Sequence, residues 1–185
     1  EVIDALVKDG SVTVSGKGKL ELPEASIKGV FEAHAGGFGF VRAEGRDEDL
    51  FIPEDCVHDA MHKDIVECRI IHEARPGKRD EAEIIRIVER GTDYIVGTYR
   101  KGSRGRRGNE AGFGFVIPDN EKFSYDIFVS KERSKGAEDG QKVVVKITDY
   151  GNPDKDKKPE GIIGEILGYP DDAGVDILSV IRAYG

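Results

Sequence analysis

Hydrophobic residues in this chain occur in short runs that are rich in β-branched and aromatic side chains and are bounded by Gly, Asp or Pro. Runs of this kind are typical of β-strands, which are usually shorter than about ten residues. The first half of the chain therefore predicts five strands, at residues 29–31, 36–41, 49–53, 60–70 and 81–88.

The same series of runs occurs a second time. The hexamer GGFGFV at 36–41 returns as AGFGFV at 111–116, 75 positions later, and four other runs return in the same order. The second copy predicts strands at residues 97–99, 111–116, 126–130, 137–147 and 160–167. The offset grows from 68 to 75 across the basic stretch KGSRGRRG, which marks an insertion in the second copy. Five matched segments in one order indicate a duplicated domain.

Five short strands per copy predict an all-β fold made of two tandem five-stranded barrels. The OB-fold is the commonest barrel of this size, so we expect two OB-fold domains. The first is assigned to residues 24–92 and the second to residues 93–168.

The two ends of the chain have different patterns. Residues 1–23 suggest a helix end followed by a hairpin, as in the remnant of a preceding domain. Residues 169–185 predict a C-terminal connector helix, because Val175, Leu178 and Ile181 recur at helical spacing behind acidic residues. The chain opens without Met and closes inside this pattern, so we expect it to be a segment of a longer protein.

The phenylalanines of the repeated hexamers are candidates for a binding surface. Residues i and i+2 of a strand share a face, so Phe38 and Phe40 point the same way, as do Phe113 and Phe115. With a Phe from the next strand, each trio would offer a platform on which nucleobases stack, each stack contributing ~1–3 kcal/mol. The alternative is that the rings fill the barrels, since Phe is usually buried. The candidates are Phe38, Phe40, Phe51, Phe113, Phe115 and Phe128.

Charge is distributed unevenly along the chain, whose net charge is −8. Residues 1–95 carry 13 basic and 21 acidic side chains, whereas residues 96–185 carry 15 of each. The stretch RKGSRGRR, which includes most of the insertion, concentrates five cations with no acid among them. Such a stretch is expected either to contact phosphates or to form a solvated loop, and both interpretations stay open. These cations are Arg100, Lys101, Arg104, Arg106 and Arg107.

Cysteine usage and hydropathy limit the class of protein. The two cysteines form no CxxC motif and no disulfide framework, which fits a reducing, cytoplasmic setting. No apolar run approaches the ~18 residues of a membrane helix. Five soft or borderline zinc ligands lie within one stretch, at Cys56, His58, His62, Cys68 and His72. Their spacing fits no closed zinc site, so we predict no metal here and keep zinc binding as a less favoured alternative.

The motifs GGFGFV…DLFIP and AGFGFV…DIFV resemble the paired RNA-binding motifs of cold-shock domains. Over nearly all of residues 24–185 the chain resembles the tandem cold-shock region of the RNB, or ribonuclease II-type, family of bacterial 3′-to-5′ exoribonucleases. The segments that carry this resemblance are IVERGTDYIVGTY, GFGFVIPDN, GAEDGQKVVVKI, EGIIGEILG and GVDILSVIRAYG. Residues 1–22 resemble the end of the winged-helix domain that precedes this region in the family.

The resemblance implies a function for the segment and for its parent protein. The segment would hold single-stranded RNA and feed it to a magnesium-dependent hydrolytic domain that begins after Gly185, in a monomeric cytoplasmic enzyme. No catalytic residue lies in the 185 residues, which should be inactive alone.

Some family positions differ in this chain. The Lys that precedes the GFGF motif is Gly36 and Ala111, the His that ends VFVH is Pro53 and Ser130, and Trp is absent. Phe31 or Tyr99 is expected to take part of the role of the missing Trp.

Two other functions stay open from the sequence. One is a free-standing RNA-binding or RNA-chaperone module. The other is a zinc-binding or protein-interaction module without a role in RNA binding.

Overall fold

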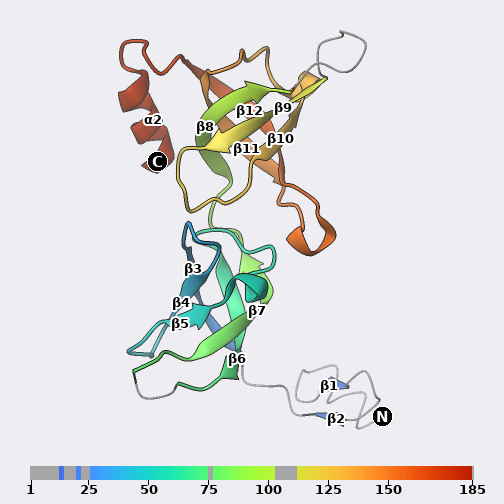
Figure 1. Ribbon diagram of the computed structural model, residues 1–185, viewed down its shortest axis with the longest axis vertical. Coiled ribbons are helices and arrows are strands. Elements are labelled where there is room, and N and C mark those ends of the chain that lie inside the picture. The colour runs from blue at the N-terminus through green and yellow to red at the C-terminus, as the bar shows by residue number, and fades with distance from the viewer. Residues whose placement is uncertain (1–12, 15–19, 22–25, 75–76, 103–111, 185) are drawn as a thin grey trace.

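The computed structural model describes residues 13–14, 20–21, 26–74, 77–102 and 112–184. Two closed β-barrels follow one another along the long axis of the molecule, with a short hairpin near the N-terminus and one α-helix beside the second barrel (Figure 1). This architecture confirms the predicted all-β fold of two five-stranded barrels.

The first barrel closes in the order β3-β4-β5-β7-β6. Its strands are β3 Ile27–Ala33, β4 Gly39–Ala43, β5 Leu50–Ile52, β6 Ile65–His72 and β7 Glu81–Glu89. Neighbouring strands are antiparallel except β5 and β7, which run parallel and meet at Phe51 and Glu81. A short 3-10 helix, η1 (Glu54–Cys56), follows β5 after Pro53.

The second barrel repeats this topology in the order β8-β9-β10-β12-β11. Its strands are β8 Tyr94–Lys101, β9 Phe113–Pro118, β10 Ile127–Ser130, β11 Lys142–Asp149 and β12 Glu160–Gly168. The parallel pair is now β10 and β12, which meet at Phe128 and Glu160. The 3-10 helices η2 (Lys131–Arg133) and η3 (Pro153–Lys155) lie in the connections after β10 and β11.

Each barrel encloses its own hydrophobic core, because successive strand residues face alternately inward and outward. The core of the first barrel consists of Phe31, Val41, Leu50, Ile52, Val66, Cys68, Ala82 and Ile84. The core of the second consists of Ile95, Tyr99, Val116, Ile127, Val129, Ala137, Val143, Val145, Ile147 and Ile163.

The glycine at the centre of each hexamer makes room for an aromatic ring from the neighbouring strand. A Cβ at Gly39 would lie 2.6 Å from Cζ of Phe31, and one at Gly114 would lie 2.5 Å from two ring atoms of Tyr99. Phe31 is fully buried and Tyr99 is 3% exposed. The expectation that either replaces the missing Trp at the binding surface is therefore wrong, because both rings fill the barrel interiors.

A cluster of polar contacts centred on Arg90 lies where the chain passes from one barrel to the other. Nη1 of Arg90 donates to the carbonyl of Asp59 and to Oδ2 of Asp64, both at 2.8 Å. Asp64 is fully buried and also accepts from the backbone N–H of Met61 and of Gly91. The Arg90 guanidinium lies 4.1 Å from the ring centroid of Tyr150, which belongs to the second barrel. The same side chain thus contacts both barrels.

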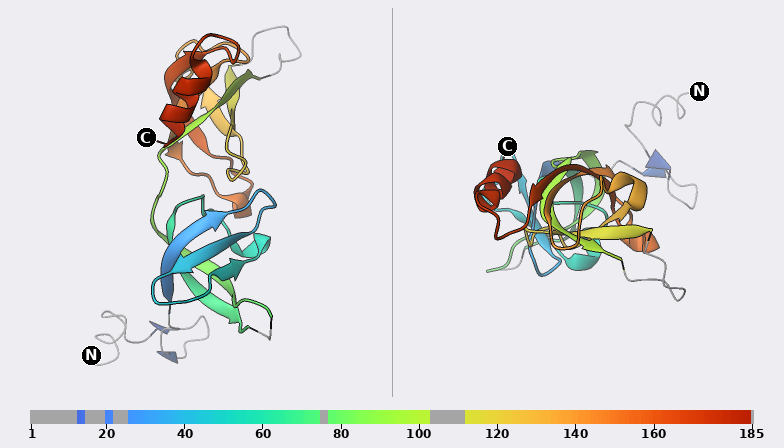
Figure 2. Two further views of the ribbon diagram at one scale, coloured as in Figure 1. Left: turned by 90° about the vertical axis from the view of Figure 1, so that its left-hand side faces the viewer. Right: turned by 90° about the horizontal axis from the view of Figure 1, so that it is seen from above.

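The ends of the chain carry the remaining elements. Strands β1 (Thr13–Val14) and β2 (Leu20–Glu21) pair antiparallel, as predicted for the hairpin, whereas the predicted helix end lies outside the described residues. Helix α2 (Val175–Tyr184) confirms the predicted C-terminal helix and packs beside β8, β11 and β12 (Figure 2). None of the described helices is both long and apolar enough to span a membrane.

Candidate nucleic-acid interface

Three phenylalanine rings gather on one side of the first barrel, and we call them the first ring cluster: Phe38 immediately before β4, Phe40 on β4 and Phe51 on β5. Their centroids are 5.7 to 5.9 Å apart, within the range of favourable aromatic contacts. All three are partly exposed and none belongs to the buried core. The alternative that these rings fill the barrel therefore does not describe the structure.

The second barrel carries the same arrangement, which we call the second ring cluster: Phe113, Phe115 and Phe128. The three centroid distances are 5.6, 5.7 and 5.8 Å. The register explains the grouping, because Phe128 on β10 lies opposite Phe115 on β9, just as Phe51 lies opposite Phe40. These rings are also partly exposed and outside the core.

The first ring cluster is extended by a histidine that sequence reasoning did not identify. The exposed His34 ring stacks on Phe38 with centroids 4.3 Å apart and planes 14° apart. Nδ1 of His34 accepts a hydrogen bond from the backbone N–H of Gly36 at 3.1 Å, so this nitrogen carries no proton in the contact. The bond also orients the ring over Phe38.

The corresponding position of the second barrel is Gly102. Its backbone N–H donates to the carbonyl of Phe113 at 3.0 Å, as that of His34 donates to the carbonyl of Phe38 at 2.9 Å. A Cβ at Gly102 would lie 2.5 Å from the Phe113 ring, so the backbone itself covers the place where the first barrel has an imidazole. The two ring clusters are therefore alike in their phenylalanines and different at this edge.

Strand β8, which precedes the basic insertion, lies beside the second ring cluster. Arg100 lies opposite Phe115 in the β8–β9 pair and forms an exposed ion pair with Asp139, 3.2 Å apart. The backbone N–H of Lys101 donates to the same carboxylate at 2.9 Å. The other predicted phosphate-binding cations, Arg104, Arg106 and Arg107, lie outside the described residues.

Two further cations that the sequence analysis missed lie over the ring clusters. Arg79 lies over Phe40 of the first cluster, with its Cζ 5.0 Å from the ring centroid. Lys158 lies over Phe115 of the second, with its Nζ 5.3 Å from the centroid. Both approach from the loop before the last strand of a barrel. No short-range sequence pattern connects them to the hexamers.

Cys68 and His62, two of the possible zinc ligands between residues 56 and 72, lie in different surroundings. Burial and the charge of Glu67 raise the pKa of the core thiol Cys68 to about 12. Burial and the charges of Lys122 and Lys63 lower the pKa of His62, whose ring packs edge-on against Phe123 of the second barrel. Within the described part of the chain, no group of three or more His, Cys, Asp or Glu is placed to hold a metal ion.

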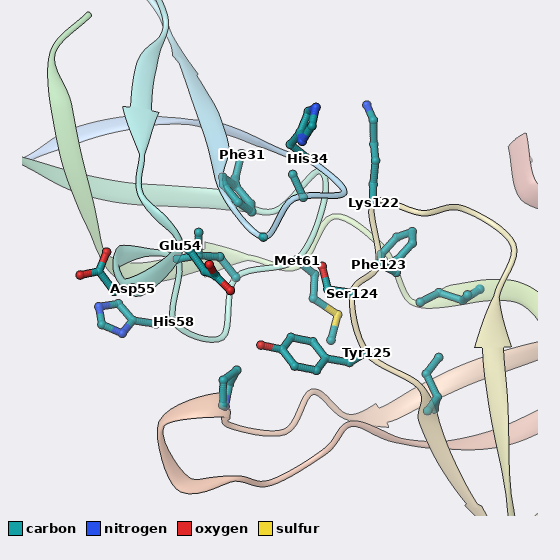
Figure 3. A pocket seen from close by; sticks show the side chains of 17 residues that line it. Phe31, His34, Glu54, Asp55, His58, Met61, Lys122, Phe123, Ser124 and Tyr125 are labelled. Atoms are coloured by element: carbon teal, nitrogen blue, oxygen red, sulfur yellow. The ribbon is translucent and has the colours of Figure 1, made fainter.

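A cavity of about 300 Å³ lies at the junction of the barrels, and none of the phenylalanines of the two ring clusters lines it. Phe31, Glu54, Asp55, His58 and Met61 line it from the first barrel, and Lys122, Phe123, Ser124 and Tyr125 line it from the second (Figure 3). His58 Nε2 lies 3.3 Å from Oε1 of Glu83, and hydrogen bonds from Arg69 and His58 lower the pKa of that carboxyl. The walls of the cavity combine apolar and charged side chains.

Family models match both barrels. The "Ribonuclease B OB domain" matches residues 29–87 and the "Cold shock domain" matches residues 115–185. Ribonuclease R of Escherichia coli strain K12 is 33% identical over 182 residues, which are 97% of this chain and 21% of that protein. Ribonuclease R of Thermotoga maritima is 32% identical over 183 residues, which are 98% of this chain and 24% of that protein.

Solved structures share the fold. Mycoplasma genitalium ribonuclease R, solved with ribose-methylated single-stranded RNA, aligns with a TM-score of 0.72 at 18% identity, over 85% of this chain and 24% of that one. Yeast Ssd1, described as a pseudonuclease, aligns with a TM-score of 0.65 at 15% identity, over 98% of this chain and 26% of that one.

The fold and the two ring clusters define a tandem OB-fold protein of the cold-shock class. Within that class, the chain belongs to the ribonuclease R family. It spans about a fifth to a quarter of the length of these two ribonuclease R proteins.

Proposed function

We propose that this segment holds single-stranded RNA by stacking bases on the two ring clusters and by contacting phosphates with nearby cations. The observation that carries the proposal is the repetition of one triangle of partly exposed rings, with matching distances, on two barrels. Stacking recognises any base, because every base has a π-face, so we expect little sequence preference. The complex of a ribonuclease R with single-stranded RNA supports this assignment.

The similarity to ribonuclease R supports a role within a longer enzyme. We propose that residues 24–92 and 93–168 act as two RNA-holding domains of a monomeric, cytoplasmic, processive 3′-to-5′ exoribonuclease. Its hydrolytic chemistry would need Mg²⁺, and the described residues do not fit such a site, because they bring together no group of metal-ligating side chains. We therefore assign hydrolysis to other parts of the parent enzyme and expect the 185 residues to be inactive alone.

The stacking proposal is tested by removing two rings. Phe113→Ala/Phe115→Ala is expected to weaken binding of a labelled oligouridine at least tenfold, because each lost stack contributes ~1–3 kcal/mol. Fluorescence anisotropy titration measures the dissociation constant. Circular dichroism checks that the barrel remains folded.

Tyr94→Ala is the matched control for this test. It removes another exposed aromatic ring of the second barrel. Tyr94 is the first residue of β8, whereas Arg100 lies near the other end of that strand. Equal affinities for the wild type and for the double Phe variant would contradict the proposal, as would an equal loss in the Tyr94 control.

The alternative of a free-standing RNA chaperone shares the ring clusters but needs no hydrolytic domain. An Asp-rich catalytic block in the parent gene, downstream of this segment, would favour the exonuclease. A parent protein without such a block would favour the chaperone.

A further inference from the structure

Arg79 and Lys158 occupy equivalent positions in the duplicated fold. Each is two residues before the last strand of its barrel, β7 or β12. In the first barrel the carbonyl of Asp80 accepts a hydrogen bond from the backbone N–H of Phe51 at 2.9 Å. In the second, the carbonyl of Pro159 accepts one from the backbone N–H of Phe128 at 2.8 Å. This bond holds the loop beside the ring cluster, so that the cation reaches the middle ring of the cluster, which is Phe40 in the first barrel and Phe115 in the second.

The loops that carry the two cations have different sequences, RPGKRDE and DKKPEG. A cation nevertheless lies over the same ring in both barrels, at 5.0 Å from the Phe40 centroid and 5.3 Å from the Phe115 centroid. The contact therefore depends on the position in the barrel and on positive charge, rather than on one loop conformation or one residue type.

Both cations are exposed and, among the described residues, neither forms an ion pair. Acidic groups nearby are occupied by other partners. Asp80, next to Arg79, pairs with Arg46, and Asp149 pairs with Lys157, the neighbour of Lys158. In the part of the chain that the structure describes, the other arginines of the barrels pair with carboxylates, whereas Arg79 and Lys158 each lie over an aromatic ring.

We propose that Arg79 and Lys158 are RNA-binding residues, one for each ring cluster. A base that stacks on the middle ring needs the ring face over which the cation lies, so binding moves the cation aside. The flexible stem then lets the charge reach the phosphate of the same nucleotide. In this arrangement each barrel binds one nucleotide by its base and its phosphate together. The inference rests on the proposed stacking function and adds two residues and a phosphate contact to it.

The salt dependence of binding separates a phosphate contact from a structural one. A cation that neutralises one phosphate of a single strand contributes ~0.7 to the slope of log K against log[salt]. Raising salt from about 50 mM to about 200 mM therefore weakens binding by about 2.6-fold for each such contact.

Lys158→Met and Arg79→Met each keep an apolar stem and remove the charge. We expect each variant to lower the slope for an oligouridine by ~0.7, and the double variant to lower it by about twice as much. Lys158→Arg keeps the charge and is expected to keep the slope. Lys146→Met is the matched control, because Lys146 lies over the Tyr94 ring at 5.7 Å but outside both ring clusters.

The outcomes distinguish this inference from the proposed function. A lower slope in Lys158→Met and Arg79→Met, with wild-type slopes in Lys158→Arg and Lys146→Met, supports the inference. Wild-type slopes in all four variants, with weakened binding in Phe113→Ala/Phe115→Ala, overturn the inference and leave the stacking function standing. Equal slope losses in the Lys146 control also overturn it, because they would show a general effect of net charge. RNA binding that is unaffected by the Phe variants would overturn the proposed function itself.

Discussion

Gly39 and Gly114 show how one residue type serves the core and the surface at once. The spacing of the phenylalanines on either side predicts their shared face, because residues i and i+2 of a strand point the same way. The sequence does not show what lies on the other face, since Phe31 and Tyr99 come from the neighbouring strand. Their rings pack against the glycines, so the motif has a packing requirement beside its proposed binding role.

Gly39→Ala is expected to destabilise the first barrel by about 2 kcal/mol or more, because overpacking a core costs ~1–3 kcal/mol. A Cβ there would lie 2.6 Å from Phe31 Cζ and 2.7 Å from the backbone carbonyl of Glu32. Urea denaturation followed by circular dichroism measures the loss. Gly164→Ala, on an exposed strand position where the nearest atom would be 3.6 Å away, is the control and should change stability little. Equal midpoints for the two variants would contradict the steric account.

The residues of the ring clusters that the sequence did not predict all reach the phenylalanine rings from loops. The stacking of His34 depends on a hydrogen bond within the β3–β4 turn. Arg79 and Lys158 reach rings that are about forty residues away in sequence, across a parallel strand pair. Arg100 was predicted as a phosphate ligand from its charge alone, and its ion pair with Asp139 depends on a similarly distant loop. Local patterns carry no information about such contacts.

The strands themselves were predicted well, and the errors at the starts of β6 and β11 have a common cause. The runs that begin at residues 60 and 137 predict strands there, whereas β6 and β11 begin at Ile65 and Lys142. A tight turn precedes each strand, with Lys63 at φ 74° in the first barrel and Gly140 at φ 88° in the second. Only the glycine is a recognisable turn residue, so the first turn could not be predicted from its own sequence.

Helix α2 is attached to the second barrel by few side chains. Val175 is 3% exposed and Arg182 pairs with Glu165, whereas Ile177 and Val180 are 62% and 59% exposed. Val175→Ala is expected to weaken docking by about 2 kcal/mol through lost burial, so that α2 opens more often than the barrel. Amide hydrogen exchange is expected to speed up at least tenfold in α2 and to stay unchanged in β11.

Val180→Ala removes the same atoms from an exposed position of the same helix and should leave exchange unchanged. A uniform increase in exchange across helix and barrel would show that α2 and the barrel open together.

At the scale of the whole molecule, the junction depends on a few polar contacts. The hydroxyl of Tyr150 donates to Oδ1 of Asp93 at 2.9 Å and lies 3.1 Å from the carbonyl oxygen of Thr92, in the chain between the barrels. Its ring lies against the guanidinium of Arg90. Burial and the hydrogen bond to Asp93 raise the Tyr150 pKa from 10.0 to about 12.

Because its folded pKa is raised, Tyr150 contributes stability that is fully present below pH 10 and is lost between pH 10 and about 12. Tyr150→Phe removes this ionisation, so its urea midpoint should fall less steeply than that of the wild type over this range. Tyr125→Phe, at a 45% exposed position, is the control and should follow the wild type. If the urea midpoints of the wild type and of Tyr150→Phe fell equally with pH over this range, the loss of stability could not be assigned to Tyr150.

Under the proposed function, the duplication of the ring cluster also has a consequence for the time that an RNA strand stays bound. A strand that reaches both clusters departs only when both release it together, because the end still held keeps the freed end at a high local concentration. Dissociation should therefore slow abruptly once an oligonucleotide is long enough to span the two barrels. An RNA strand that slips on one barrel stays tethered by the other, so the RNA can move along the protein without dissociating.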